Sequence, residues 1–147
     1  MPDIHIEQIR HELTWKLRHK VLYPNVGSVQ TQGMPEDLDG IHFGAFVNGW
    51  LVAVVSLFQN GTDFQFRKFA VAEDMQGKGI GRELLQYITD QAINNGGTHI
   101  WCNARVTATN FYAKAGFTQT GEGFTRGGFD YVIMEKPLQN KTDAQIA

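Results

Sequence analysis

Cysteine is almost absent from this sequence, since Cys102 is the only one among 147 residues. A single thiol cannot form an internal disulfide, and metal sites built from several thiolates are excluded. A lone free thiol is typical of a reducing compartment, so we expect a cytoplasmic protein.

Long apolar runs and an excess of one charge are lacking too. The longest apolar stretch, residues 50–58, is interrupted by Ser56 and is far too short to cross a bilayer. The first thirty residues hold no uninterrupted apolar core of a secretory signal, so we expect none. The formal net charge is −2, which provides no general attraction to phosphate backbones or anionic membranes. We therefore expect neither nucleic acid nor a membrane among the partners.

The chain does have enough apolar material for one core. Apolar residues make up 42% of it, which excludes disorder as a description of the whole chain. Its length is close to that of one ordinary domain. We expect a single domain over residues 1–138 and a frayed polar tail over residues 139–147.

The N-terminal third combines a predicted helix with a long polar connection. Residues 6–21 place apolar side chains at three- and four-residue steps, which predicts an amphipathic helix. A polar connection over residues 25–40 follows, and loops of that length are often functional. The helix also has a cluster of basic side chains, typical of a solvated face, with a site for an anionic group as the alternative. The cluster comprises Arg10, His11, Lys16, Arg18, His19 and Lys20.

The remainder predicts alternating strands and helices. Asn48-Gly49 joins two strand-like runs and favours a type I′ turn, because both central residues need a positive φ. The pattern indicates a mixed, mostly antiparallel sheet with helices packed on it, in the α/β (α+β) class. The expected strands are 41–47, 50–58, 64–71, 98–104, 117–122 and 130–135, and the later helices are 82–95 and 107–115.

A glycine-rich segment, residues 76–82, separates the third strand from the next helix. Glycines let a ligand approach the backbone, and the free N–H groups of a helix N-terminus bind phosphate. Lys78 and Arg82 can add positive charge, although an ordinary glycine-rich turn is the alternative. A Walker A loop is excluded because Gly79 follows Gly77-Lys78, where Ser or Thr is required. A dinucleotide fingerprint is excluded because Arg82 stands in the place of its last glycine.

Two motifs resemble those of the GNAT superfamily of N-acetyltransferases. Gln76-x-x-Gly79-x-Gly81, after a strand that ends at residues 69–71, resembles the superfamily's acetyl-CoA-binding motif. Residues 108–117, Ala-Thr-Asn-Phe-Tyr-Ala-Lys-Ala-Gly-Phe, resemble its Ala-x-x-Phe-Tyr-x-Lys-x-Gly-Phe segment. Order, spacing and element types agree, and the resemblance covers at least residues 41–136. It implies the acyl-CoA N-acyltransferase fold and transfer of an acetyl group from acetyl-CoA to a primary amine, without a metal.

The resemblance also implies roles for single residues. Tyr112 would be the general acid that protonates the departing CoA thiolate, and a phenol with a pKa of about 10 suits that role. Core packing is the alternative for Tyr112 and for Phe111, which we place beside the cofactor. The pantetheine would pair with the strand-edge backbone of Phe69, Ala70 and Val71. The pyrophosphate would be held by Gln76, Gly77, Lys78, Gly79, Ile80, Gly81 and Arg82.

The sequence departs from the superfamily's pattern in two places. Arg105 stands where many members have an asparagine, seven residues before the tyrosine, and Glu73 stands where a proline is frequent. The general base is left unassigned, because a water chain often replaces a dedicated base in this superfamily. The candidates for it are Glu73, Asp74, His42 and His19.

The acceptor, a small-molecule or peptide amine, is expected at the irregular parts of the chain: the N-terminal helix, residues 25–40 and a loop over residues 118–129. Cys102 lies on an apolar strand face and is expected to be a core residue, so we expect direct transfer in a ternary complex. A non-catalytic acyl-CoA-binding sensor or partner module is the alternative, and the oligomeric state stays open, a homodimer included. The acceptor residues would be Arg18, His19, Tyr23, Phe124, Arg126 and Phe129, whose basic and aromatic character hints at an acceptor with an anionic or aromatic part.

Overall fold

The computed structural model describes residues 3–139, which form two compact units. Within that range the first unit comprises residues 3–58 and 66–90, and the second comprises residues 59–65 and 91–139. The prediction of a single domain over residues 1–138 stays a prediction. The predicted tail, residues 139–147, lies outside the described residues from residue 140 onward.

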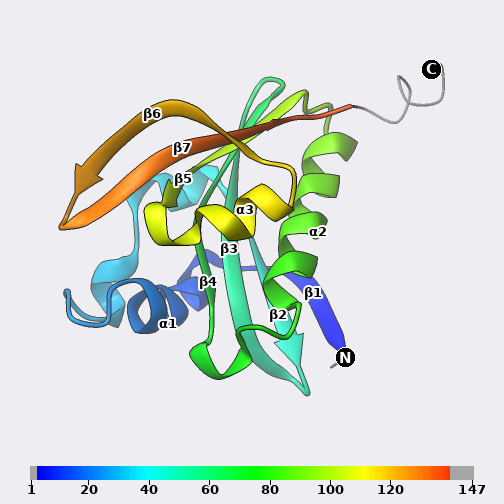
Figure 1. Ribbon diagram of the computed structural model, residues 1–147. Helices are drawn as coiled ribbons and strands as arrows, with labels where there is room; N and C mark the ends of the chain where they lie inside the picture. Colours follow the sequence, from blue (N-terminus) through cyan, green and yellow to red (C-terminus); the bar gives the residue numbers. More distant parts are fainter. Residues whose placement is uncertain (1–2, 140–147) are drawn as a thin grey trace. The chain divides into compact units, whose positions relative to one another are not determined.

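Seven strands form one mixed sheet in the order β1-β2-β3-β4-β5-β7-β6, as predicted for the fold class (Figure 1). The pairs β1/β2, β2/β3, β5/β7 and β6/β7 are antiparallel, and β4/β5 is parallel over residues 63–65. The strands are β1 (Ile4–Ile9), β2 (Ile41–Val47), β3 (Trp50–Asn60), β4 (Asp63–Val71), β5 (His99–Arg105), β6 (Thr118–Arg126) and β7 (Phe129–Pro137).

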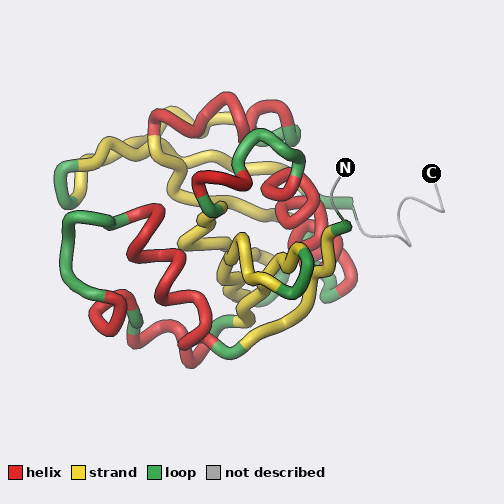
Figure 2. The backbone as a smooth tube through the Cα atoms, turned by 90° about the horizontal axis from the view of Figure 1, so that it is seen from below, coloured by secondary structure: helices red, strands yellow, loops and turns green. Residues whose placement is uncertain are grey.

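The helical elements of the first unit cover both faces of its strands. On one face Leu17 joins Ile9 and Val54 in a buried cluster, and on the other Phe43 contacts Tyr87 of α2, with ring centroids 5.5 Å apart. Between β1 and β2 the chain runs through three contiguous short helical stretches and then two more that are set apart by loops (Figure 2). Those stretches are η1 (His11–Thr14), α1 (Trp15–Leu17), η2 (Arg18–Leu22, a π-helical turn), η3 (Val29–Gln32) and η4 (Pro35–Asp39); η5 (Glu73–Met75) and α2 (Ile80–Asn94) follow β4.

The predicted hairpin at Asn48-Gly49 is confirmed. Both residues have a positive φ, 51° and 81°, and Val47 pairs with Trp50 across the turn. This backbone twist matches that of the flanking strands, which explains why the dipeptide favours it. Among residues 3–139 no helix has the length and apolar character needed to cross a membrane.

The predicted helix over residues 6–21 is wrong at its N-terminal end. Residues 4–9 form β1, which pairs antiparallel with β2 from Ile4↔Val47 to Ile9↔His42. The β-branched isoleucines favour an extended strand, and β2 offers a partner edge that no local pattern reveals. Helical structure begins only at His11.

The second unit contains β5, η6 (Val106–Ala108), α3 (Thr109–Lys114), β6 and β7. The predicted loop over residues 118–129 is wrong, because β6 extends to Arg126 and the turn lies at Gly127-Gly128, with φ values of 59° and 82°. The glycines near residue 121 suggest a loop by composition. In the structure they occupy an irregularity between Gln119 and Gly123 within the β6/β7 ladder.

Candidate active site

The glycine-rich segment forms a turn that leads from η5 into α2 in the first unit. Gly77 and Gly79 have φ values of 76° and 84°, a region that L side chains adopt rarely. A Cβ added at Gly77 would meet nothing within 4 Å, so the backbone, and not crowding by the protein, requires glycine there. The space in front of this turn suits the close approach of a ligand.

The start of α2 aims backbone donors at the same turn. The N–H of Glu83 donates to Gly79 O over 3.1 Å as the helix begins. The amides of Gly81 and Arg82 lie before this first hydrogen bond of the helix. They therefore have no helical carbonyl as an acceptor and can bind an anion. The buried Ile80 side chain, 1% exposed, anchors this turn in the core.

Gln76 connects the turn to the end of β4. Its Nε2 donates to Val71 O over 2.9 Å. Val71 is the last residue of β4, and Ala70 beside it is buried, whereas Phe69 is half-buried. The structure therefore brings the predicted pyrophosphate loop and the predicted pantetheine strand together within the first unit.

Tyr112 and Phe111 lie on α3 in the second unit. The Tyr112 ring packs between Phe111 and Phe117, with centroid distances of 5.1 and 6.0 Å. Burial raises the pKa of the Tyr112 phenol, and the nearby Cys102 thiol acts in the same direction. At neutral pH the phenol is therefore protonated, and burial makes it a weaker acid than an exposed tyrosine.

Cys102 is a core residue, as predicted. Strand β5 buries alternate residues, so Cys102 and Ile100 face the core and His99 does not. Burial raises the pKa of the Cys102 thiol to about 12. At neutral pH the thiol is protonated, and a protonated thiol is a poor nucleophile.

Arg18 does not face a substrate, which corrects the sequence prediction. Its guanidinium is fully buried and binds Asp37 through two hydrogen bonds of 2.8 and 2.9 Å. It also donates to Ser56 Oγ over 2.9 Å and to Gln32 O over 3.1 Å. Burial opposes ionisation of Asp37, but the hydrogen bonds from Arg18 and the Met34 amide, together with the positive charge of Arg18, outweigh it and keep the pKa of Asp37 below its ordinary value. The sequence did not predict this ion pair, because no periodic pattern indicates that Arg18 meets Asp37, nineteen residues further along the chain.

His42, one of the candidate bases, belongs to the same buried network. Its Nδ1 lies 2.6 Å from Ser56 Oγ and its Nε2 lies 2.8 Å from Asp37 O, so both ring nitrogens are engaged. Burial lowers the pKa of His42. These contacts assign His42 a structural role, whereas Glu73 and Asp74 are exposed on η5 and His19 is half-buried.

The predicted acceptor residues of the second unit, Phe124, Arg126 and Phe129, lie on the β6–β7 hairpin. The guanidinium of Arg126 lies 5.1 Å from the Phe124 ring centroid. Arg105, which replaces the asparagine common in the superfamily, lies 3.9 Å above the Phe129 ring. This hairpin and Arg105 therefore combine basic and aromatic groups, and their role in acceptor binding stays a prediction.

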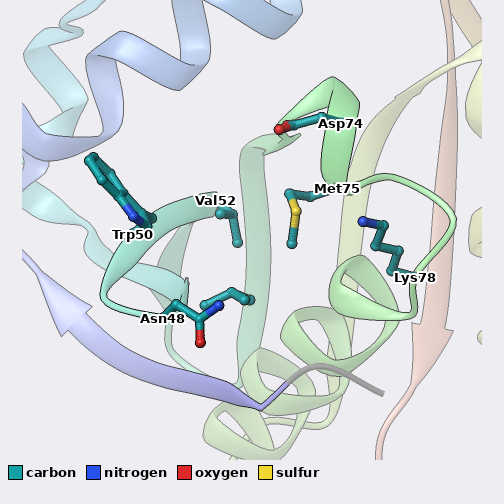
Figure 3. Close-up of a pocket in the computed structure, with 7 residues that line it drawn as sticks. Asn48, Trp50, Val52, Asp74, Met75 and Lys78 are labelled. Atoms are coloured by element: carbon teal, nitrogen blue, oxygen red, sulfur yellow. The ribbon is translucent and has the colours of Figure 1, made fainter.

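Two further features of the first unit escaped the sequence analysis. Lys68, in β4, donates from Nζ to Tyr23 Oη over 2.6 Å, and nothing in the sequence marks it. A pocket of about 450 Å³ lies between the β2–β3 hairpin and the turn after β4 (Figure 3). Its lining residues are Val47, Asn48, Trp50, Val52, Asp74, Met75 and Lys78.

Metal ligands do not assemble in the described part of the chain. Residues 3–139 hold no group of three or more His, Cys, Asp or Glu side chains that could bind a metal ion. Both ring nitrogens of His99, for example, are engaged in hydrogen bonds to Asp63 and Glu135, at 2.5 and 2.8 Å. The prediction of a metal-free reaction stays a prediction.

Comparison with known proteins agrees with these motifs. A family model described as an acetyltransferase (GNAT) domain matches residues 19–138. The uncharacterized N-acetyltransferase YitI of Bacillus subtilis (strain 168) is 26% identical over 145 residues, which cover 92% of this chain and 97% of that protein.

Solved structures share the fold. A candidate N-acetyltransferase from Lactobacillus plantarum has a TM-score of 0.81 at 22% identity, with 92% of this chain and 99% of that chain covered. A GNAT family acetyltransferase from Elizabethkingia anophelis, solved with acetyl-CoA bound, has a TM-score of 0.72 at 19% identity, with 92% and 98% covered. The chain therefore belongs to the GNAT family of acetyltransferases, which confirms the prediction of an acetyl-CoA-dependent acyltransferase.

Proposed function

We propose that this protein transfers the acetyl group of acetyl-CoA to a primary amine, by direct attack within a ternary complex. The observation that supports it most strongly is the turn at Gly77 and Gly79, where two left-handed glycines lead into a helix N-terminus. The similar Elizabethkingia anophelis protein, solved with acetyl-CoA, supports the choice of donor.

The turn would hold the CoA pyrophosphate through backbone amides. Backbone amides do not titrate, so their binding of the pyrophosphate does not change with pH. The helix dipole also favours the negative charge of the pyrophosphate. The exposed cations Lys78 and Arg82 would add long-range attraction. The Gln76 side chain donates a hydrogen bond to Val71 O and would hold the turn against the end of β4, the strand that we assign to the pantetheine.

The chemistry consists of one bond exchange and the proton movements that accompany it. The neutral amine nitrogen bonds to the thioester carbonyl carbon, and the carbon–sulfur bond breaks. The nitrogen loses one proton to water, the CoA sulfur receives one from Tyr112 Oη, and water then returns a proton to the Tyr112 phenolate. Burial raises the pKa of Tyr112, so the phenol carries its proton in the resting enzyme but is a weaker acid than an exposed tyrosine.

Replacing Gly79 with valine should abolish stabilisation by acetyl-CoA. At about a hundred times its dissociation constant, acetyl-CoA should stabilise the parent protein by roughly 2.7 kcal/mol, measured as a thermal shift. A side chain at Gly79 would stand where the pyrophosphate binds.

Gly96 provides the matched control for this variant. Its φ is 82°, close to the 84° of Gly79, and a Cβ there meets nothing within 4 Å. Gly96→Val should therefore suffer similar backbone strain but keep the full ligand shift. A full shift in Gly79→Val would contradict the assignment of the loop.

The direct mechanism predicts that Cys102→Ala retains activity. Incubated with acetyl-CoA and a panel of primary amines, the parent and the variant should release CoA thiol at similar rates, and mass spectrometry should find no acetylated cysteine. The buried, protonated thiol supports this expectation. A stable acetyl adduct on Cys102 or parallel-line kinetics would overturn direct transfer. No amine-dependent thiol release, with acetyl-CoA still bound, would favour the non-catalytic alternative.

Several other features stay predictions. The acceptor is a small-molecule or peptide amine, with no nucleic acid or membrane as a partner. A cytoplasmic location follows from the lone free thiol, and a homodimer stays open as an assembly state.

A further inference from the structure

Lys68 has a backbone conformation that is unusual for its residue type. Its φ is 57°, in the left-handed region, although it lies inside β4. Residues of this kind are sparse in proteins and concentrate at functional sites, where the surrounding structure maintains them.

The left-handed backbone at Lys68 changes the direction of its side chain. Phe64, Phe66 and Ala70 alternate along β4 and are buried, and Lys68 shares their parity. A regular strand would therefore turn its ammonium toward the core. In the structure Lys68 is half-buried, so the local distortion re-aims the side chain, as strand irregularities commonly do.

Tyr23 holds the Lys68 ammonium in a defined place. Lys68 Nζ donates to Tyr23 Oη over 2.6 Å and lies 4.5 Å from the ring centroid. Tyr23 in turn is fixed at the end of η2, where its N–H donates to Arg18 O and His19 O over 3.2 Å each. Arg18 is itself held by its hydrogen bonds to Asp37, so the backbone that positions Tyr23 beside Lys68 is fixed. The hydrogen bond and the ring contact therefore hold Lys68 Nζ beside the Tyr23 hydroxyl.

The helical stretch that leads to Tyr23 is predominantly basic. Lys16 and Lys20 are exposed on α1 and η2, and the acid Glu12 on η1 is paired with Arg10 and His11. Lys68 also comes directly before Phe69, the first residue of the strand segment that we assign to the pantetheine. A positive charge at this position disfavours a second ammonium group on an acceptor and favours an anionic one.

We propose that Lys68 and Tyr23 select the acceptor, by binding a carboxylate that the acceptor carries in addition to its amine. The ammonium supplies the charge, and the phenol, which accepts from Lys68, donates its own proton to the carboxylate. The acceptor class is therefore the amino acids and peptides with a free carboxylate. This inference rests on the proposed acetyl transfer.

The test compares each amine as its carboxylate and as its carboxamide, for example β-alanine with β-alaninamide, by kcat/KM per neutral amine. The parent should prefer the carboxylate by about ten- to a hundredfold, the range of one charge-assisted hydrogen bond. Lys68→Met should bring the ratio near one, and Lys68→Arg should keep part of it. Should Lys68→Met not fold, Lys68→Gly, which suits the left-handed φ, replaces it.

Arg67→Met is the matched control. Arg67 is the neighbouring cation on β4, and its guanidinium lies 5.9 Å from the Phe58 ring. This variant should keep the carboxylate preference, and all variants should keep the thermal shift with acetyl-CoA. A preference that survives in Lys68→Met, or a parent that favours the carboxamides, overturns the proposal. In both cases acetyl transfer itself continues, whereas failure of the proposed function would leave no amine acetylated.

Discussion

Arg18→Met is expected to lower the free energy of unfolding by about 3–5 kcal/mol, the range for removing one partner of a buried ion pair. The substitution leaves the Asp37 carboxylate, 2% exposed, without its bidentate partner. Ser56 loses a donor as well. Urea unfolding at neutral pH, with the slope checked for two-state behaviour, measures the effect.

The choice of neutral pH follows from the pKa of Asp37. Arg18 and the Met34 amide together keep that pKa below its ordinary value of 3.8, so the stabilising contribution is complete above this value. It is lost as the pH falls through the lowered pKa of the folded state. Unfolding at pH 7 therefore measures the pair at full strength.

Two variants separate the ion pair from nonspecific effects. Arg10→Met removes a cation with 78% side-chain exposure and should change stability by less than about 1 kcal/mol. The double variant Arg18→Met/Asp37→Leu removes both charges and should recover much of the loss, because no buried charge is left uncompensated. A loss below about 1 kcal/mol in Arg18→Met would show that the pair does not stabilise this unit.

Tyr112→Phe is expected to lower kcat by about 10²–10⁴-fold while acetyl-CoA affinity is retained. Phenylalanine keeps the ring that packs between Phe111 and Phe117 and removes only the hydroxyl. The loss should therefore appear in turnover and not in the thermal shift with acetyl-CoA. Steady-state rates of thiol release measure it.

Tyr87→Phe is the control for removal of a phenol. Tyr87 lies on α2 with its ring against Phe43, and we assign it no chemical role. This variant should turn over at the parental rate. If Tyr112→Phe does so too, the tyrosine is a packing residue and another group protonates the thiolate.

The Arg18 prediction and the proposed role of Tyr23 in acceptor recognition both concern the segment between β1 and β2. The Arg18–Asp37 pair anchors η2 to η4, and the Tyr23 N–H is bonded to the last turn of η2. Loss of the ion pair should therefore disturb acceptor recognition before it disturbs acetyl-CoA binding. This order follows because the glycine turn at residues 76–82 forms no part of that network.

The sequence alone determined those parts of the protein whose signal is local. Asn48-Gly49 imposes positive φ values on adjacent residues, so the β2–β3 hairpin was predictable. The glycines at 77 and 79 and the alternation that buries Cys102 are similarly local, because each depends on φ or on side-chain parity within a few residues.

The tertiary structure decided whatever depends on a distant partner. Residues 4–9 are a strand because β2 supplies their hydrogen bonds, although their apolar spacing suits a helix equally well. Arg18 is buried because Asp37 and Ser56, nineteen and thirty-eight residues away, compensate its charge. Lys68 meets Tyr23 across forty-five residues through a left-handed kink that lysine does not favour. Such pairings leave no periodic trace in a chain, because their energy arises only when the segments pack together.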